Sequence, residues 1–222
     1  MNRLRTVIQK WRTDFNYKTF FNSSFSFVLS VIFALYNGYL GIHLKSLWNG
    51  SVCTYYLLLS AIRSMLILTE NRIRHNPSEK DNQLRKKIFI TSSVLLLFIN
   101  AALIIPVSLM VKMEKPVSMT LIPSITMAAY TTYKIILAVI NYRKKDKSTN
   151  LFVKELRTLN LMDAIVSVIT LQNTLIMTVS HDVKSMLAFT AVTSAVMLII
   201  MITVSVISLI NGLKQFSVSG ER

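Results

Sequence analysis

The chain has 222 residues, 52% of them apolar and 16% charged, with a formal net charge of +15 at pH 7. Soluble domains carry about a quarter charged residues, so this composition excludes an ordinary soluble protein. A strongly basic chain can indicate nucleic-acid binding, but here the basic residues lie between long apolar stretches, which argues against a nucleic-acid partner. We therefore expect an all-α polytopic membrane protein.

Residues 1–19 are too polar to cross a bilayer. Their apolar side chains recur at helical spacing, while the basic side chains fall mostly on other faces. This pattern, with a tryptophan among the apolar residues, predicts an amphipathic helix in the membrane interface; a disordered basic tail is the alternative. The apolar positions are Leu4, Ile8, Trp11 and Phe15.

Six apolar stretches follow, each near the length that spans a bilayer. They are residues 20–43, 52–69, 88–111, 118–141, 159–179 and 186–211. The first stretch begins too late and is too long for a cleavable signal peptide, so we expect it to remain as a signal anchor. Cys53 is the only cysteine, which rules out a disulfide bond within the chain.

Lysine and arginine are divided unevenly between the connecting segments. Nineteen of them lie in four segments. These are the segment before the first span, the connections between spans two and three and between spans four and five, and the segment after the last span. The other connections hold only Lys45, Lys112, Lys115 and Lys184. The positive-inside rule then predicts six crossings of the cell membrane with both termini in the cytoplasm, 214–222 being a cytoplasmic tail. We also expect the basic segments to attract anionic lipid head groups.

Short motifs of the first three spans recur in the same order in the last three. The pairs are ALYNGY (34–39) with AAYTTY (128–133), Ala61-Ile62-X-Ser64 with Ala164-Ile165-X-Ser167, and TSSVLLL (91–97) with TSAVMLI (193–199). A unit of three crossings forces the next unit to enter from the opposite side of the membrane. We therefore predict two inverted three-helix repeats, residues 20–111 and 112–213.

Three predicted spans each contain one ionisable residue well inside, namely Arg63, Lys134 and Asp163. Such residues are costly in hydrocarbon and usually face the protein interior or a wet cavity. At the rise of an α-helix, all three lie at a depth on the order of 10 Å from the cytoplasmic side. We expect Arg63 to contact Asp163, with Lys134 nearby. A purely structural ion pair, or snorkelling of the cations toward the cytoplasm, is the alternative.

Polar residues also share a face on several spans, most continuously on span five. Because polar groups that face lipid would stay unsatisfied, these faces should turn inward. The residues expected to line a path for a solute or ion are Arg63, Lys134, Asp163, Ser167, Thr170, Asn173, Tyr130 and Asn37. The same faces carry Asn160 on span five, Ser26 and Ser30 on span one, and Tyr56 on span two. Alternatively, these serines and threonines bond their own backbone and serve packing alone.

Enzymatic activity has little support in the sequence. The three histidines lie near span ends without metal-ligand spacing, and there is neither a glycine-rich phosphate loop nor a nucleophile with a base, so we expect no metal or cofactor. The pattern favours a small transporter or channel for a small solute, cation or proton, in which Asp163 binds the cation and Arg63 competes for it. A non-transporting assembly or lipid-binding subunit is the alternative. A chain of 222 residues is small for a complete path, so we also consider a homodimer that would complete it.

Overall fold

In the computed structural model, every element of the described chain is an α-helix. The structure describes residues 15–43, 45–75, 81–113, 121–143, 151–179 and 183–220. The helices are α2 (Phe15–His43), α3 (Leu47–His75), α4 (Asp81–Ala102), α5 (Ile104–Met113), α6 (Leu121–Arg143), α7 (Leu151–Val179) and α8 (Val183–Gly220). Residues 1–14, which hold most of the predicted interfacial helix, lie outside the described residues.

Among the described residues, four helical segments are long and apolar enough to cross a membrane. They are Ser23–His43, Leu47–His75, Asp81–Leu109 and Ala188–Lys214. Helix α6 contains a shorter apolar segment, Ala128–Ile140. Many large apolar side chains, such as Leu35, Phe98 and Ile199, lie exposed on the outward faces of the helices. An apolar surface of this extent suits contact with lipid, so the prediction of an all-α membrane protein is confirmed at this level.

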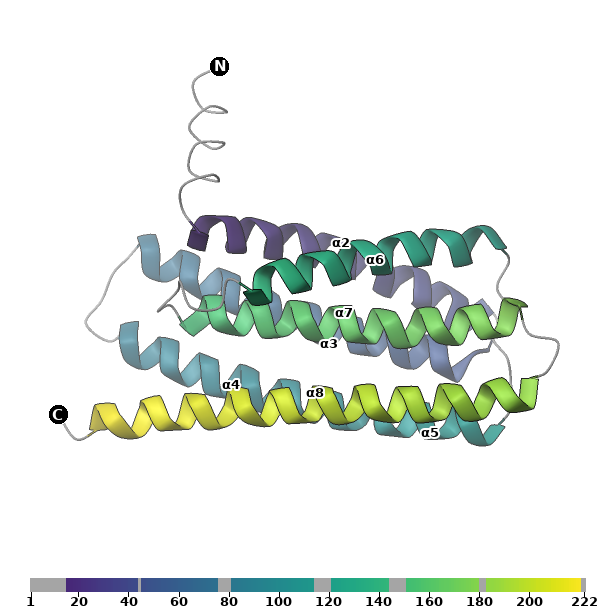
Figure 1. Cartoon of the computed structure of the whole chain (residues 1–222). Helices are drawn as coiled ribbons and strands as arrows, with labels where there is room; N and C mark the ends of the chain where they lie inside the picture. The colour runs from purple at the N-terminus through teal and green to yellow at the C-terminus, as the bar shows by residue number, and fades with distance from the viewer. Residues whose placement is uncertain are drawn as a thin grey trace, which may run out of the picture.

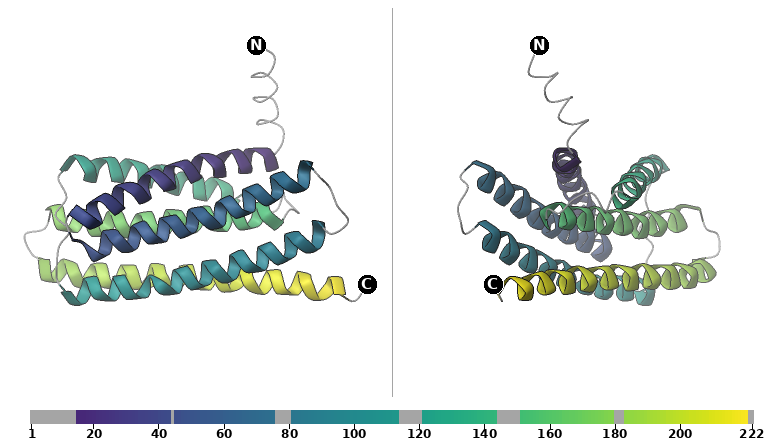
Figure 2. Two further views of the ribbon diagram at one scale, coloured as in Figure 1. Left: turned by 180° about the vertical axis from the view of Figure 1, so that it is seen from behind. Right: turned by 60° about the vertical axis from the view of Figure 1, so that its left-hand side comes forward.

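The helices are arranged in three layers (Figure 1). The first layer holds α2 and α6, the second α3 and α7, and the third α8 with α4 and α5, as the right-hand view of Figure 2 shows. The two passes within each layer run in opposite directions. Helix α2 packs mainly along α3, α6 along α7, and α4 along α8. The start of α2 and the end of α8 lie at the same end of the bundle, called the terminal end below.

Helix α7 occupies the centre of the bundle. It contacts α2, α3, α4, α6 and α8, and most of its side chains between Phe152 and Thr170 are buried, whichever way they point. Neighbouring helices therefore separate α7 from the surroundings. This position explains why α7 can carry several polar residues.

Proline shapes the third pass of the chain. Helices α4 and α5 are separated only by Leu103, and backbone hydrogen bonds continue across the break from Leu103 N to Ile99 O (3.3 Å) and from Val107 N to Leu103 O (3.2 Å). Pro106 has no N–H to offer the carbonyl of Ala102, and its ring crowds that carbonyl. The two helices are thus one pass with a local interruption.

The turn between α2 and α3 is tight. Lys45 adopts a left-handed φ of 49°, and the hydroxyl of Ser46 accepts a hydrogen bond from the N–H of Asn49 (3.3 Å), which caps the start of α3. A Cβ placed on Gly41 would lie 2.9 Å from the backbone nitrogen of Gly50. Glycine at position 41 therefore lets the two helices approach closely beside the turn.

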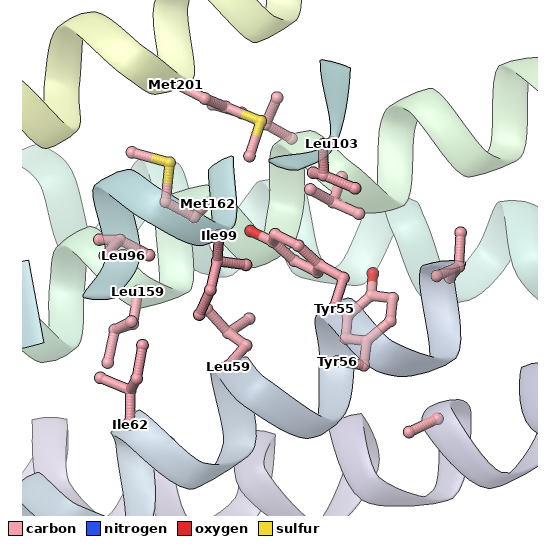
Figure 3. Close-up of a cluster of buried hydrophobic side chains, with 14 of the residues drawn as sticks. Tyr55, Tyr56, Leu59, Ile62, Leu96, Ile99, Leu103, Leu159, Met162 and Met201 are labelled. Carbon is pink, nitrogen blue, oxygen red and sulfur yellow. The ribbon is translucent and has the colours of Figure 1, made fainter. Parts of the chain in front are cut away.

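The apolar core extends between the second and third layers. Figure 3 shows Tyr55, Leu59 and Ile62 of α3 converging on side chains from the third pass, α7 and α8. The labelled partners are Leu96, Ile99, Leu103, Leu159, Met162 and Met201. All of them are buried, so apolar contacts hold α3 against α7, and Ile62 and Met162 are the chain neighbours of the charged residues Arg63 and Asp163.

Candidate functional site

Asp163 of α7 lies between two cations that come from different helices. Its Oδ2 is 3.4 Å from Nη2 of Arg63 on α3, and its Oδ1 accepts a hydrogen bond from Nζ of Lys134 on α6. Arg63 is 0% exposed, Asp163 1% and Lys134 6%. The predicted contact between Arg63 and Asp163 is therefore present, and Lys134 joins it directly.

Two serines of α2 connect the arginine with the carboxylate. Nη1 of Arg63 donates to the hydroxyls of Ser26 (3.0 Å) and Ser30 (3.2 Å), and both hydroxyls donate to Oδ2 of Asp163 at 3.3 Å. Nη2 of Arg63 also donates to Oδ1 of Asn160 (3.0 Å), one turn before Asp163 on α7. Both charged groups are thus bonded to polar groups, as buried charges require, although Nε of Arg63 has no partner among the described residues.

Aromatic rings surround the ammonium group of Lys134. Its Nζ lies 4.4 Å from the ring centroid of Tyr130, 4.8 Å from that of Tyr56 and 5.7 Å from that of Phe33. These distances suit cation–π attraction, which is stronger where water is excluded. The hydroxyl of Tyr130 is buried without a hydrogen-bond partner among the described residues.

Two other predicted site residues follow Asp163 on α7 and donate hydrogen bonds to helix backbone. Ser167 donates to the carbonyl of Asp163 (2.8 Å) and shares a hydrogen bond with the hydroxyl of Tyr56 (2.9 Å). Thr170 donates to the carbonyl of Val166 (2.8 Å). Such bonds to backbone carbonyls are the ones that the packing interpretation of the polar stripe expects.

Two predicted residues are not part of the cluster as described. Asn37 of α2 donates to the carbonyl of Phe33 (2.8 Å), and its side-chain oxygen is buried without a partner in the described structure. It lies about two turns from Ser30, away from Asp163. The side chain of Asn173 lies outside the described residues.

The structure contains an apolar groove, away from Asp163. It has a volume of about 810 Å³ and lies between α2, α3 and the third pass, near the turn that joins α2 and α3. Gly38, Cys53, Tyr55, Phe98 and Pro106 are among its lining residues, and none of the three charged residues of the cluster is. Because all three charged side chains are buried, the cluster is closed in this conformation.

The charge balance of the cluster is its main chemical feature. One carboxylate faces two cations, which leaves a formal excess of one positive charge in a buried place. Both oxygens of Asp163 already bond to cations or hydroxyls. An anionic group would restore neutrality, since an uncompensated buried charge costs several kcal/mol.

Sequence reasoning missed one buried acidic residue, Glu155, near the start of α7. It lies among basic residues that precede the predicted span at 159–179, so the sequence pattern indicated that it belongs to a cytoplasmic loop. Helix α7 begins at Leu151, and its first turns bury apolar residues at helical spacing, Phe152, Leu156 and Leu159. This spacing was the signal that could have placed Glu155 on a buried helix.

Comparison of the chain with protein-family models, curated proteins and solved structures found no match.

Proposed function

We propose that the protein crosses the cell membrane six times as two inverted three-helix repeats, α2–α5 and α6–α8. The layered arrangement supports this, because each layer pairs the corresponding passes of the two units in opposite directions. The basic segments adjoin helix ends at the terminal end of the bundle, which favours a cytoplasmic location for that end. The close packing of α2 on α3 and of α6 on α7 fits the same plan.

Within this architecture, the protein acts as a small transporter or channel whose path passes the Asp163 cluster. The observation that carries the proposal is the buried contact of Asp163 with both Arg63 and Lys134, bonded to hydroxyls of α2. Ionisable residues in the interior of a membrane protein are costly and commonly belong to a solute or ion pathway. In inverted-repeat transporters, such sites lie where the two units meet. Arg63 and Asp163 come from different units.

The excess positive charge favours a small anion or an anionic group on the solute. Lys134, held by aromatic rings and by one carboxylate oxygen, and Arg63 would together bind such a group. Because Asp163 is 1% exposed, passage requires a second conformation in which the cluster reaches water. Separation of α6 from α2 and α3 would expose Lys134 in that state.

A flux measurement on the purified protein in liposomes tests this proposal. Vesicles loaded with chloride, nitrate or acetate are diluted into sulfate buffer, and efflux is followed with ion-selective electrodes. We expect at least one anion to leave vesicles that contain the protein faster than vesicles without protein. The Lys134→Met variant should lose this additional efflux. The matched control is Thr132→Val, since Thr132 is exposed on the same helix and bonds only the carbonyl of Ala128 in the described structure. Efflux that is unchanged in Lys134→Met would refute the path.

The closed packing favours a second candidate, a non-transporting membrane subunit that assembles with other components or binds lipid. In that case the Arg63–Asp163–Lys134 cluster only holds the helices together. Folded, liposome-inserted protein that passes neither anions nor sodium, potassium or protons would support this candidate over transport. The unfolding temperature of the protein reconstituted in liposomes with and without anionic lipid would then test the role of the basic segments.

A further inference from the structure

A second buried polar cluster joins α7 to α4 and α8, whereas Lys134 of the first cluster comes from α6. Glu155 is 0% exposed, and the partners of its two oxygens among the described residues are serine hydroxyls. Oε1 accepts from Ser92 (3.1 Å) and Ser93 (3.0 Å) of α4, and Oε2 accepts from Ser208 of α8 (2.8 Å). Glu155 precedes Asp163 by eight residues, about 12 Å along the helix axis, so the two clusters are separate.

No cation balances the charge of Glu155 in the described structure. The ion pairs found there join Asp163 with Arg63 and Lys134, and Glu70 with Arg74 and Arg85. Charged residues that flank Glu155 on the helices around it, none of them paired with it, are Arg85, Lys86 and Lys87 on α4, Lys154 and Arg157 on α7, and Lys214 on α8. A buried carboxylate with only hydroxyl partners is costly in its charged form, and binding of a cation would remove that cost.

The three serine hydroxyls make five contacts but have only three protons, so not all of these contacts can be hydrogen bonds at the same time. Ser92 has one proton, but both the carbonyl of Phe89 (2.8 Å) and Oε1 of Glu155 (3.1 Å) lie within hydrogen-bond distance of its oxygen. Ser93 and Ser208 lie 3.5 Å apart and both face the carboxylate. Five side-chain oxygens thus converge from three helices without a nitrogen or sulfur ligand, a set that suits a hard cation.

Close packing of α8 on α4 brings these oxygens together. A Cβ on Gly212 would lie 2.6 Å from the ring of Phe89, one turn before Ser92 on α4. Glycine at position 212 therefore allows α8 to lie against α4 beside the cluster, which brings Ser208 to the carboxylate.

We propose that Glu155, Ser92, Ser93 and Ser208 form a binding site for one monovalent cation, either Na⁺ or a proton. A single carboxylate supplies one negative charge, which matches a monovalent ion better than a divalent one. Binding at this site does not depend on transport. A bound cation here could also compensate the charge of an anion carried at the Asp163 cluster. Only this coupling of the two ions rests on the proposed function.

The test is the unfolding temperature of the full-length protein in detergent, measured in NaCl, KCl and choline chloride at equal ionic strength between pH 6 and 8.5. If Na⁺ binds, the unfolding temperature of the wild type rises with Na⁺ concentration but not with choline, and Glu155→Gln abolishes the rise. If a proton binds, the wild type depends on pH and not on Na⁺, and Glu155→Gln removes that dependence.

Two further variants complete the test. Glu70→Gln removes a carboxylate that is paired with Arg74 and Arg85, so it should keep the wild-type response to Na⁺ or pH. Ser208→Ala removes one oxygen ligand and should shift the Na⁺ response to higher concentration. The proposal is overturned if wild type and Glu155→Gln respond alike to Na⁺ and to pH. Since no flux is measured, this failure is distinct from failure of the transport proposal.

Discussion

Nη2 of Arg63 lies 3.4 Å from Oδ2 of Asp163, although 100 residues separate the two in the chain. The contact joins α3 to α7 inside the bundle, where neither side chain reaches solvent. Lys134 bonds the other oxygen of the same carboxylate. Asp163 therefore neutralises one of the two cations and leaves one excess positive charge in the cluster.

Asp163→Asn should destabilise the protein by about 3–5 kcal/mol, because it leaves two buried cations without a carboxylate. Adding Arg63→Gln should recover part of the loss, since one of the stranded charges is then removed. Unfolding midpoints in detergent for the two single variants and the double variant check this. A double variant whose loss equals the sum of the single losses would mean that the two side chains are not coupled.

Lys134→Met should cost less stability than Asp163→Asn. The substitution removes one hydrogen bond and the cation–π contacts with Tyr56 and Tyr130, but it leaves Arg63 and Asp163 as a balanced pair. The two variants can be compared by the same unfolding assay. If Lys134→Met is the more damaging of the two, the lysine contributes more than the charge count indicates.

Gly41→Ala should destabilise the α2–α3 hairpin by about 1–3 kcal/mol, because its Cβ would meet the backbone of Gly50 and push the helices apart. Gly50→Ala is the matched control. A Cβ there meets nothing within 4 Å, so the better helix propensity of alanine should leave stability equal or slightly higher. Equal losses in both variants would show that close approach is not the cause.

Cys53 should react with a membrane-impermeant thiol reagent added outside intact cells. It is partly exposed and lines the groove close to the turn between α2 and α3, at the end of the bundle opposite the terminal end. The control is Cys53→Ser with Ser148→Cys, which places the only thiol in a basic segment and should react only after the membrane is permeabilised. Labelling of Ser148→Cys from outside would reverse the proposed orientation.

Much of the local structure could be read from residue patterns. Apolar stretches place the helices because a chain in lipid must satisfy its backbone hydrogen bonds internally, and helix α3 indeed covers the stretch predicted at 52–69. The burial of Arg63 and Asp163 also followed from their isolation within apolar segments. Their common depth made the contact between them an expectation that the structure bears out.

Other features depended on contacts that no local pattern encodes. The serines of α2 could be placed on a polar face, but not specifically between Arg63 and Asp163. The aromatic rings around Lys134 come from three helices. Glu155 was missed because a carboxylate among basic residues resembles a solvated loop in sequence.

The sequence by itself determined the helices, the charged residues that must be buried and the uneven distribution of basic residues, because these follow from hydropathy and charge along one chain. Only the tertiary structure decided which helix occupies the centre and which groups face each charge. Helix α7 tolerates Asp163 and Glu155 because neighbouring helices surround it and supply cations to the first and hydroxyls to the second. That difference in partners arises from packing between distant segments, which local sequence does not specify.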